Sequence, residues 1–153
     1  MRAVVQRVSD ATVSIQDGNS EIITGSIHNG LLVYLGVGRN DTEKDAAYLA
    51  DKIANLRIFM DSDEKMNLSL LDMGMPALVV SQFTLYADAR KGRRPSWSNA
   101  ADNDTAFALY ECFCNELGKR GVLVQTGKFR EIMKVRYTNE GPITILLDSE
   151  KIF

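Results

Sequence analysis

The chain has 153 residues, of which 45% are hydrophobic and 25% are charged, a composition typical of one globular domain. Its formal net charge of −2 gives no global sign of nucleic-acid binding, so any such contact must come from a local patch. No apolar run approaches the roughly 20 residues of a membrane-spanning helix, and the first residues lack a signal-peptide core. We therefore expect a cytoplasmic protein without membrane contact, folded as a single domain over residues 1–153.

The N-terminal quarter alternates between apolar and polar side chains, which is the pattern of half-buried strands. Clusters of turn residues at Asp17–Ser20 and His28–Gly30 interrupt the alternation. The pattern predicts an antiparallel meander of four short strands, at residues 2–8, 12–15, 21–27 and 31–37. Arg7 stands on a strand that otherwise faces the core, and taken alone it is best explained as a solvated edge residue.

Helical spacing replaces this alternation after Asn40. Apolar residues recur every three or four positions, and either Asp41 or Thr42 can cap the start. This predicts an amphipathic helix that packs on the sheet and ends at about Phe59.

The second half of the chain predicts a strand, a helix and a strand that together can form a crossover. Residues 77–80 are a short apolar run that predicts a buried strand, and residues 122–125 predict the returning strand. An apolar stripe between them predicts a second amphipathic helix, capped at Asn103 or Asp104 and ended by Gly118 or Gly121. Further strands are predicted at residues 67–71, 133–137 and 143–147. The predicted fold class is α/β, with two packed, mainly β layers of mixed or antiparallel strands and two amphipathic helices.

The residue inventory argues against several common catalytic sites. One histidine and two cysteines, Cys112 and Cys114, cannot make a zinc tetrad. His28 lies in a polar turn, where a solvated role is favoured over membership of a catalytic triad. Gly36-Val37-Gly38 lacks the other residues of a phosphate-binding loop or a dinucleotide fingerprint. We therefore expect neither a metal nor an organic cofactor.

Polar side chains follow the buried strand at the point where its apolar run ends. Ser81, Gln82 and Thr84 are costly there unless they are hydrogen bonded. A second polar segment, Asn139–Thr144, surrounds the pair Gly141-Pro142. Each segment alone can be a strand end that satisfies its polar groups locally. Together they favour a site made of hydroxyls, amides and main-chain groups, which suits hydrolysis of a reactive ester.

The segments Ser81–Leu85 and Asn139–Thr144 resemble the two signature motifs of the D-aminoacyl-tRNA deacylases, and the likeness extends from Met1 to Ser149. The resemblance implies a DTD-like fold and a homodimer with active sites at the subunit interface. It implies hydrolysis of D-aminoacyl-tRNA at its 3′ end, and of glycyl-tRNA mischarged on the alanine tRNA, without a cofactor. This chain departs from the family at Arg130-Glu131, where the family usually has small residues.

The catalytic residues implied by the resemblance are Ser81, Gln82, Phe83 and Thr84. In a regular strand, Gln82 and Thr84 share one face and Ser81 and Phe83 the other. Either a bulge lies between them or some of them act through the main chain, and we favour the N–H groups around Gln82 and Phe83 as oxyanion donors. The nucleophile is either water or a hydroxyl, with Thr84 and Thr144 as the candidates.

The resemblance implies that Gly141 and Pro142 are the chiral selectivity element. It implies that their peptide bond is cis and that the pair enters the partner subunit's pocket, where it excludes the side chain of an L-amino acid. Arg7 and Thr144 are then supporting residues, and Arg7 braces the pair.

A basic loop follows the candidate site. Arg90, Lys91, Arg93 and Arg94 are four of five consecutive residues, with Trp97 beside them. Most charge runs are simply solvated, but arginines in a loop beside a site suit contacts with an RNA backbone. Two functions of other classes stay open, a non-catalytic RNA-binding module that uses this loop and an esterase for small acyl esters.

Overall fold

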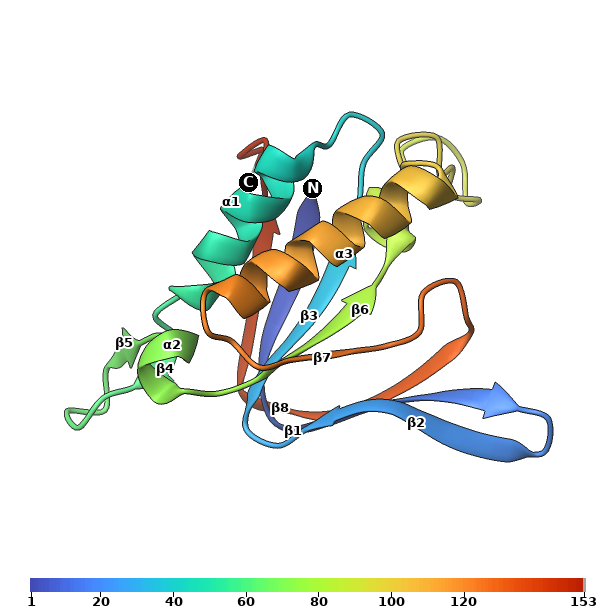
Figure 1. The fold of residues 1–153 in the computed structure, drawn as a ribbon. Coiled ribbons are helices and arrows are strands. Elements are labelled where there is room, and N and C mark those ends of the chain that lie inside the picture. The colour runs from blue at the N-terminus through green and yellow to red at the C-terminus, as the bar shows by residue number, and fades with distance from the viewer. Residues whose placement is uncertain (153) are drawn as a thin grey trace.

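The computed structural model describes residues 1–152, in which a large mixed sheet carries three α-helices and a small two-stranded sheet (Figure 1). The large sheet contains β1 (Arg2–Asp17), β2 (Ser20–Ile27), β3 (Gly30–Gly36), β6 (Ala77–Ser81), β7 (Val124–Thr126) and β8 (Met133–Asp148). The small sheet pairs β4 (Phe59–Met60) with β5 (Met66–Leu68). The helices are α1 (Glu43–Ala54), α2 (Leu70–Met73) and α3 (Asn103–Lys119), and a 3₁₀ turn, η1 (Phe83–Tyr86), follows β6. This architecture confirms the predicted α/β class.

Strand pairing divides the large sheet into an antiparallel and a parallel part. The long strand β1 is antiparallel to β2, β3 and β8. In contrast, β6 pairs in parallel with β3 on one side and with β7 on the other. Parallel neighbours need a crossover connection, and α3 supplies it between β6 and β7. The predicted strand, helix and strand unit is therefore confirmed.

The large sheet bends into two layers, because β1 pairs with β3 along its first half and with β2 along its second half. In Figure 1, β2 and the adjoining parts of β1 and β8 pass beneath β6 and β7. Gly25 of β2 marks the close approach, since a Cβ there would lie 2.5 Å from the Thr126 carbonyl oxygen and 2.8 Å from Leu78 Cδ1. A buried apolar cluster fills the space between the layers; its members are Val8, Ala11, Val13, Ile27, Leu32, Leu78 and Val80.

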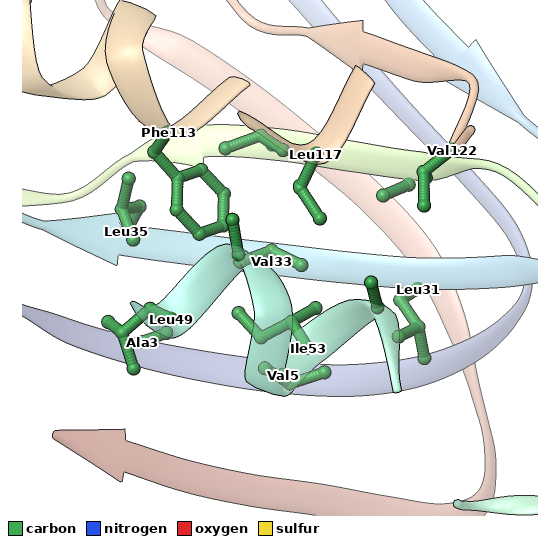
Figure 2. Packing of buried hydrophobic residues seen from close by; sticks show 14 of the residues in the cluster. Ala3, Val5, Leu31, Val33, Leu35, Leu49, Ile53, Phe113, Leu117 and Val122 are labelled. Atoms are coloured by element: carbon green, nitrogen blue, oxygen red, sulfur yellow. The ribbon is translucent and has the colours of Figure 1, made fainter. Parts of the chain in front are cut away.

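A second and larger core lies between the other face of the sheet and the helices α1 and α3. Figure 2 shows Leu49 and Ile53 of α1 and Phe113 and Leu117 of α3 directed at the side chains of β1 and β3. All four of these helical side chains are fully buried. Because alternate residues of β3 enter the two cores, both faces of this central strand are apolar. None of the helices in residues 1–152 is long and apolar enough to span a membrane.

The predicted meander of four short strands is wrong, because residues 2–8 and 12–15 belong to one continuous strand, β1. Residues 133–137 and 143–147 likewise belong to the single strand β8. The two long strands pair with each other along most of their length, and shifts in their register absorb the polar segments between the predicted pieces. A local pattern cannot reveal this, since the pairing joins residues that are far apart in sequence.

The ends of two other predicted elements are also wrong. The first helix ends at Ala54, five residues before the predicted end at Phe59. The chain then turns, and Phe59 is buried in β4. Arg7 Nη1 donates to the Ile58 carbonyl oxygen at 2.7 Å and holds this segment in place. The strand predicted at residues 67–71 ends at Leu68. Ser69 caps the unpredicted helix α2 there, because its hydroxyl accepts the Asp72 N–H at 3.1 Å and the Asp72 carboxylate accepts the Ser69 N–H at 2.8 Å.

Candidate active site

The polar segment after β6 leaves the strand instead of continuing it. β6 ends at Ser81, Gln82 has φ −144° and ψ 83°, and the next four residues form η1. The segment therefore does not follow a regular strand, and a 3₁₀ turn stands where we considered a bulge. Gln82 N–H donates to the Leu35 carbonyl oxygen at 2.8 Å, which is the last link of this segment to β3. Gly36 permits the turn to pack closely, because a Cβ there would lie 2.9 Å from the Gln82 carbonyl oxygen.

Residues near the N-terminus hold η1 in place. Arg2 Nη1 donates to the Leu85 carbonyl oxygen at 3.1 Å, and the Arg2 guanidinium lies 4.6 Å from the centre of the Tyr86 ring. The Tyr86 hydroxyl donates to Asp41 Oδ2 at 3.3 Å. Burial, and then the nearby Asp41 carboxylate, raise the pKa of Tyr86, so this hydroxyl stays protonated and keeps donating. The turn is thus a rigid support and not a mobile loop.

A cavity of about 660 Å³ opens beside η1, which is a volume typical of small-molecule sites. Ser81, Gln82 and Phe83 form one part of its wall. Trp97 also lines the cavity, and its ring lies edge-on to that of Phe83 with 5.1 Å between ring centres. The Phe83 side chain is 57% exposed and that of Trp97 is 42% exposed, so an aromatic pair stands at the mouth.

The ionisable groups of the cavity wall are poor general bases. The Tyr110 hydroxyl donates to the Val79 carbonyl oxygen at 2.8 Å, and burial raises the pKa of Tyr110. Among the described lining residues the one carboxylate is Glu131, which is exposed and lies 3.9 Å from Lys128 Nζ. No group of three His, Cys, Asp or Glu side chains within residues 1–152 could hold a metal ion. The other polar groups of the wall include main-chain groups, the side chains of Ser81, Gln82 and Asn103, and the Arg130 guanidinium.

Two main-chain amides stand at the start of η1, and they differ from the pair that we expected. Gln82 N–H is already bonded to Leu35, so its predicted part as an oxyanion donor is wrong. The N–H groups of Phe83 and Thr84 belong to the first turn of η1, where a helix has no carbonyl of its own to accept them. Phe83 also lines the cavity. Its amide is therefore the better placed donor.

The two threonines considered as nucleophiles are both engaged elsewhere. The Thr84 hydroxyl accepts a hydrogen bond from the Gln82 side-chain amide, and Thr84 does not line the cavity. The Thr144 hydroxyl accepts from Gln6 Nε2 at 3.1 Å and from Asn139 Nδ2 at 3.0 Å. Each hydroxyl thus serves its own local hydrogen-bond network.

We predict that Thr84→Ala lowers the deacylation rate constant by less than about tenfold, because it only frees the Gln82 side chain. Removal of a true nucleophile would cost several orders of magnitude. Single-turnover rates with charged tRNA would measure the difference. An acyl-enzyme trapped on Thr84 would contradict the prediction.

Gly141 and Pro142 form an exposed turn within β8, and their peptide bond is cis. The pairing of β8 with β1 skips at this point, where the partner of Gln6 is Thr144 and the partner of Val8 is Asn139. Gly141 has φ +119°, and a Cβ placed on it would lie 3.4 Å from Arg7 Nη2. Arg7 is therefore not the solvated edge residue that its charge alone suggests, because it is only 7% exposed and lies beneath this turn.

Within one protomer the turn lies far from the cavity. Strand register aligns Arg7 with Leu31 and Leu31 with Ala77, which is the first residue of β6. Ser81 is at the other end of β6, roughly 13 Å away at the usual rise per residue. Neither Gly141 nor Pro142 lines the cavity. The structure therefore does not bring the two polar segments of one chain together.

The basic loop lies next to the aromatic pair at the cavity mouth, and Asp88 and Ser96 close it through two N–H···O bonds of 2.9 Å. Arg90 is not free, because its guanidinium binds both oxygens of Asp88, at 2.9 Å and 2.6 Å. These contacts lower the pKa of Asp88 to about 2. The remaining basic residues of the loop are exposed and make no ion pair with any described residue; they are Lys91, Arg93 and Arg94.

The sequence did not predict two residues of the cavity wall, Tyr110 and Phe129, or the contact by which Arg2 supports η1. Tyr110 lies on the apolar stripe of α3, where it resembles any core residue, so no local signal marks it. Phe129 also lines the cavity, whereas the sequence singles out only Arg130 and Glu131, which follow it. In the sequence, Arg2 is one of the polar residues of an alternating strand, which predicts only that its side chain is solvated. Only the pairing of distant strands places it under η1.

Comparison with known proteins identifies a family whose model covers nearly the whole chain. The family model described as D-Tyr-tRNA(Tyr) deacylase matches residues 4–148. A D-aminoacyl-tRNA deacylase of Thermotoga petrophila is 56% identical over 153 residues, and one of Clostridioides difficile is 55% identical over 153 residues, with all of each chain covered.

Two solved structures share this architecture. One, named c-Myc DNA Unwinding Element Binding Protein, has a TM-score of 0.87 at 38% identity, covering 97% of this chain and 98% of that one. Another, described as a probable eukaryotic D-amino acid tRNA deacylase, shares the fold with a TM-score of 0.80 at 21% identity, covering 95% of this chain and 97% of that one. With a family model that spans nearly the whole chain and relatives above half identity along its full length, this protein belongs to the D-Tyr-tRNA(Tyr) deacylase family.

Proposed function

We propose that the protein hydrolyses the ester bond that joins a D-amino acid to the terminal ribose of its tRNA and releases both. The observation that carries this proposal is the cavity beside η1, whose wall offers the Phe83 amide but no free general base. Such a wall suits an activated ester better than an amide, because a positioned water and an oxyanion hole are then sufficient. Membership of the family supports the same reaction. Because the substrate is a charged tRNA, we assign the activity to the cytoplasm.

The Phe83 amide, with that of Thr84 beside it, receives the negative charge that develops on the ester carbonyl oxygen. A water molecule attacks the carbonyl carbon, and the C–O bond to the ribose breaks as the ribose oxygen takes the proton that the water gives up. The vicinal ribose hydroxyl of the substrate can help to activate that water, which compensates for the missing base. Ser81 and Gln82 line the site and orient the substrate.

Chiral selection requires a second copy of the chain in this proposal. The exposed turn at Gly141 and Pro142 cannot reach the cavity of its own protomer, but in a homodimer it can enter the cavity of the partner. There it would occupy the space of an L side chain, so that only D-amino acids and glycine are accepted. Asn139 and Arg7 support the turn, since Asn139 Oδ1 accepts the Ile143 N–H at 3.0 Å and Arg7 packs beneath Gly141. Glycyl-tRNA mischarged on the alanine tRNA is then a second substrate.

The deciding experiment compares D-tyrosyl-tRNA, L-tyrosyl-tRNA and a small D-tyrosine ester as substrates of the purified protein. The proposal expects rapid release of D-tyrosine from tRNA and little release of L-tyrosine. Equal rates for both enantiomers and for the small ester would favour an unspecific esterase. Tight tRNA binding without hydrolysis would favour a non-catalytic RNA-binding module, which the exposed Arg93 and Arg94 would also suit.

Replacing Arg93 and Arg94 together with alanine is expected to weaken tRNA binding and to lower the slope of log K against log salt by about 1.4, since each lost phosphate contact on single-stranded RNA removes about 0.7. Arg90→Ala should have a smaller effect, because Arg90 is already paired with Asp88. Lys44→Ala with Lys52→Ala, which removes two exposed charges from α1, is the matched control. Filter binding at several salt concentrations measures the slope. An unchanged slope for the arginine variant would contradict the contact.

A further inference from the structure

The loop between β7 and β8 forms part of the cavity wall, and the proposed reaction does not explain its features. Phe129, Arg130, Glu131 and Ile132 all line the cavity. Ile132 is 91% exposed, so this stretch stands at the mouth and not in the interior. Figure 1 shows this loop and the basic loop at the same edge of the molecule, one above the other. Trp97, which follows the basic loop, and residues 129–132 both line the cavity, so both loops border it.

Arg130 has an unusual backbone conformation for a residue with a side chain. Its φ is +65°, in the left-handed region where glycine is favoured. A residue that is held in this conformation at a site is a reason to ask what its side chain does. Packing gives no answer, because Arg130 is exposed.

The loop contains one ion pair, between Lys128 and Glu131, and Arg130 is not part of it. Glu131 N–H donates to the Lys128 carbonyl oxygen at 3.3 Å, and Lys128 Nζ lies 3.9 Å from Glu131 Oε1. The nearest cation to the Glu131 carboxylate is therefore Lys128, which does not line the cavity. Among the residues that the structure describes, Arg130 makes no ion pair. Its guanidinium is available at the cavity mouth.

The surroundings of the mouth suit a single-stranded polyanion. Arg93 and Arg94 stand in the basic loop, while Phe83 and Trp97 offer partly exposed rings at the entrance. Cationic groups that flank aromatic platforms are a common way to bind single-stranded nucleic acid. Arg130 adds a second cationic side to this entrance. The planar guanidinium also matches the geometry of phosphate oxygens.

We propose that Arg130 binds a backbone phosphate of the single-stranded 3′ end of the tRNA and so positions the ester in the cavity. This inference rests on the proposed function. With the ester carbonyl at the Phe83 amide and the terminal nucleoside inside the cavity, the chain must leave through the mouth, and its first phosphate emerges there. Arg130 is thus a binding residue for the polynucleotide and takes no part in bond breaking.

The experiment compares Arg130→Gly and Arg130→Lys with the parent protein on two substrates, D-tyrosyl-tRNA and 3′-O-(D-tyrosyl)adenosine, which has the ester and the ribose but no phosphate. Arg130→Gly should raise KM for the tRNA about five- to tenfold at low salt and lower its salt slope by about 0.7. Its kcat on tRNA and its kcat/KM on the nucleoside ester should stay unchanged. Arg130→Lys should restore most of the affinity. Glycine relieves the backbone, so the variant should melt about 2 °C higher and not lower.

Lys44→Ala is the control, since it removes one exposed positive charge from α1, outside the cavity wall, and its KM should stay within about twofold of the parent value. Equal losses of Arg130→Gly on both substrates would overturn the inference, because they would indicate a change in loop structure. An unchanged KM for tRNA would overturn it too. A parent protein that is inactive on both substrates would instead refute the proposed function and, with it, this inference.

Discussion

Gly141→Ala is expected to lower deacylation of D-aminoacyl-tRNA by about 100-fold or more while the protein stays folded, because misplacing a positioning group by about 1 Å can cost that much. The φ of +119° at Gly141 disfavours any side chain, and an alanine Cβ would lie 2.9 Å from Ile143 Cγ1 and 3.2 Å from Ile143 N. The turn must therefore shift. The turn itself is exposed, but Ile143 packs against the larger core, so we expect the shift to lower stability by about 1–3 kcal/mol. Thermal unfolding and single-turnover kinetics measure the two effects.

The same variant tests whether the turn acts across the dimer. If Gly141→Ala protein is mixed with a variant that is inactive in the cavity, a mixed dimer contains one site with both an intact cavity and an intact turn. Random exchange of subunits should then restore about a quarter of the parent activity, since half of the dimers are mixed and each has one working site. If the turn served its own protomer, no site would work. A mixture that stays inactive, although native mass spectrometry shows mixed dimers, would disprove the shared site.

Phe83→Pro is expected to be the inactive partner variant, with a loss of about 10²–10³ in rate, the usual cost of removing one oxyanion donor. Proline lacks the N–H, and Phe83 is the first residue of η1, where the fixed φ of proline fits a helical turn. The backbone can therefore keep its path while the amide disappears. Pre-steady-state hydrolysis of D-tyrosyl-tRNA would measure the loss.

Phe83→Ala is the matched control for this change. It removes the same exposed ring, and with it the edge contact to Trp97, but it keeps the N–H group. We expect its single-turnover rate at saturating tRNA to stay within about tenfold of the parent, because loss of the exposed ring weakens tRNA binding but leaves the N–H group in place. Comparable losses in the proline and alanine variants would show that the ring, and not the amide, is what catalysis needs.

Local patterns in the sequence were sufficient for the elements whose cause is local. The apolar run at residues 77–80 is the buried strand β6, and the helical spacing after Asp41 is α1. The Asp102 side chain caps α3, one residue before the predicted candidates, because its Oδ1 accepts the N–H groups of Asp104 and Thr105. The two polar motifs also stood out from the sequence, since hydroxyl and amide side chains beside a buried strand need partners.

Contacts between segments that are distant in sequence were decided only by the tertiary structure. β1 and β8 are continuous because they pair with each other, and no segment of either sequence contains that information. Gln82 N–H cannot serve as an oxyanion donor because the register of β6 against β3 places it beside the Leu35 carbonyl oxygen, which accepts it. The same register places Arg7 under Gly141 and keeps that turn a strand's length from Ser81. Hydrogen-bond register joins residues that are far apart in sequence, so the periodicity of a single segment cannot encode it.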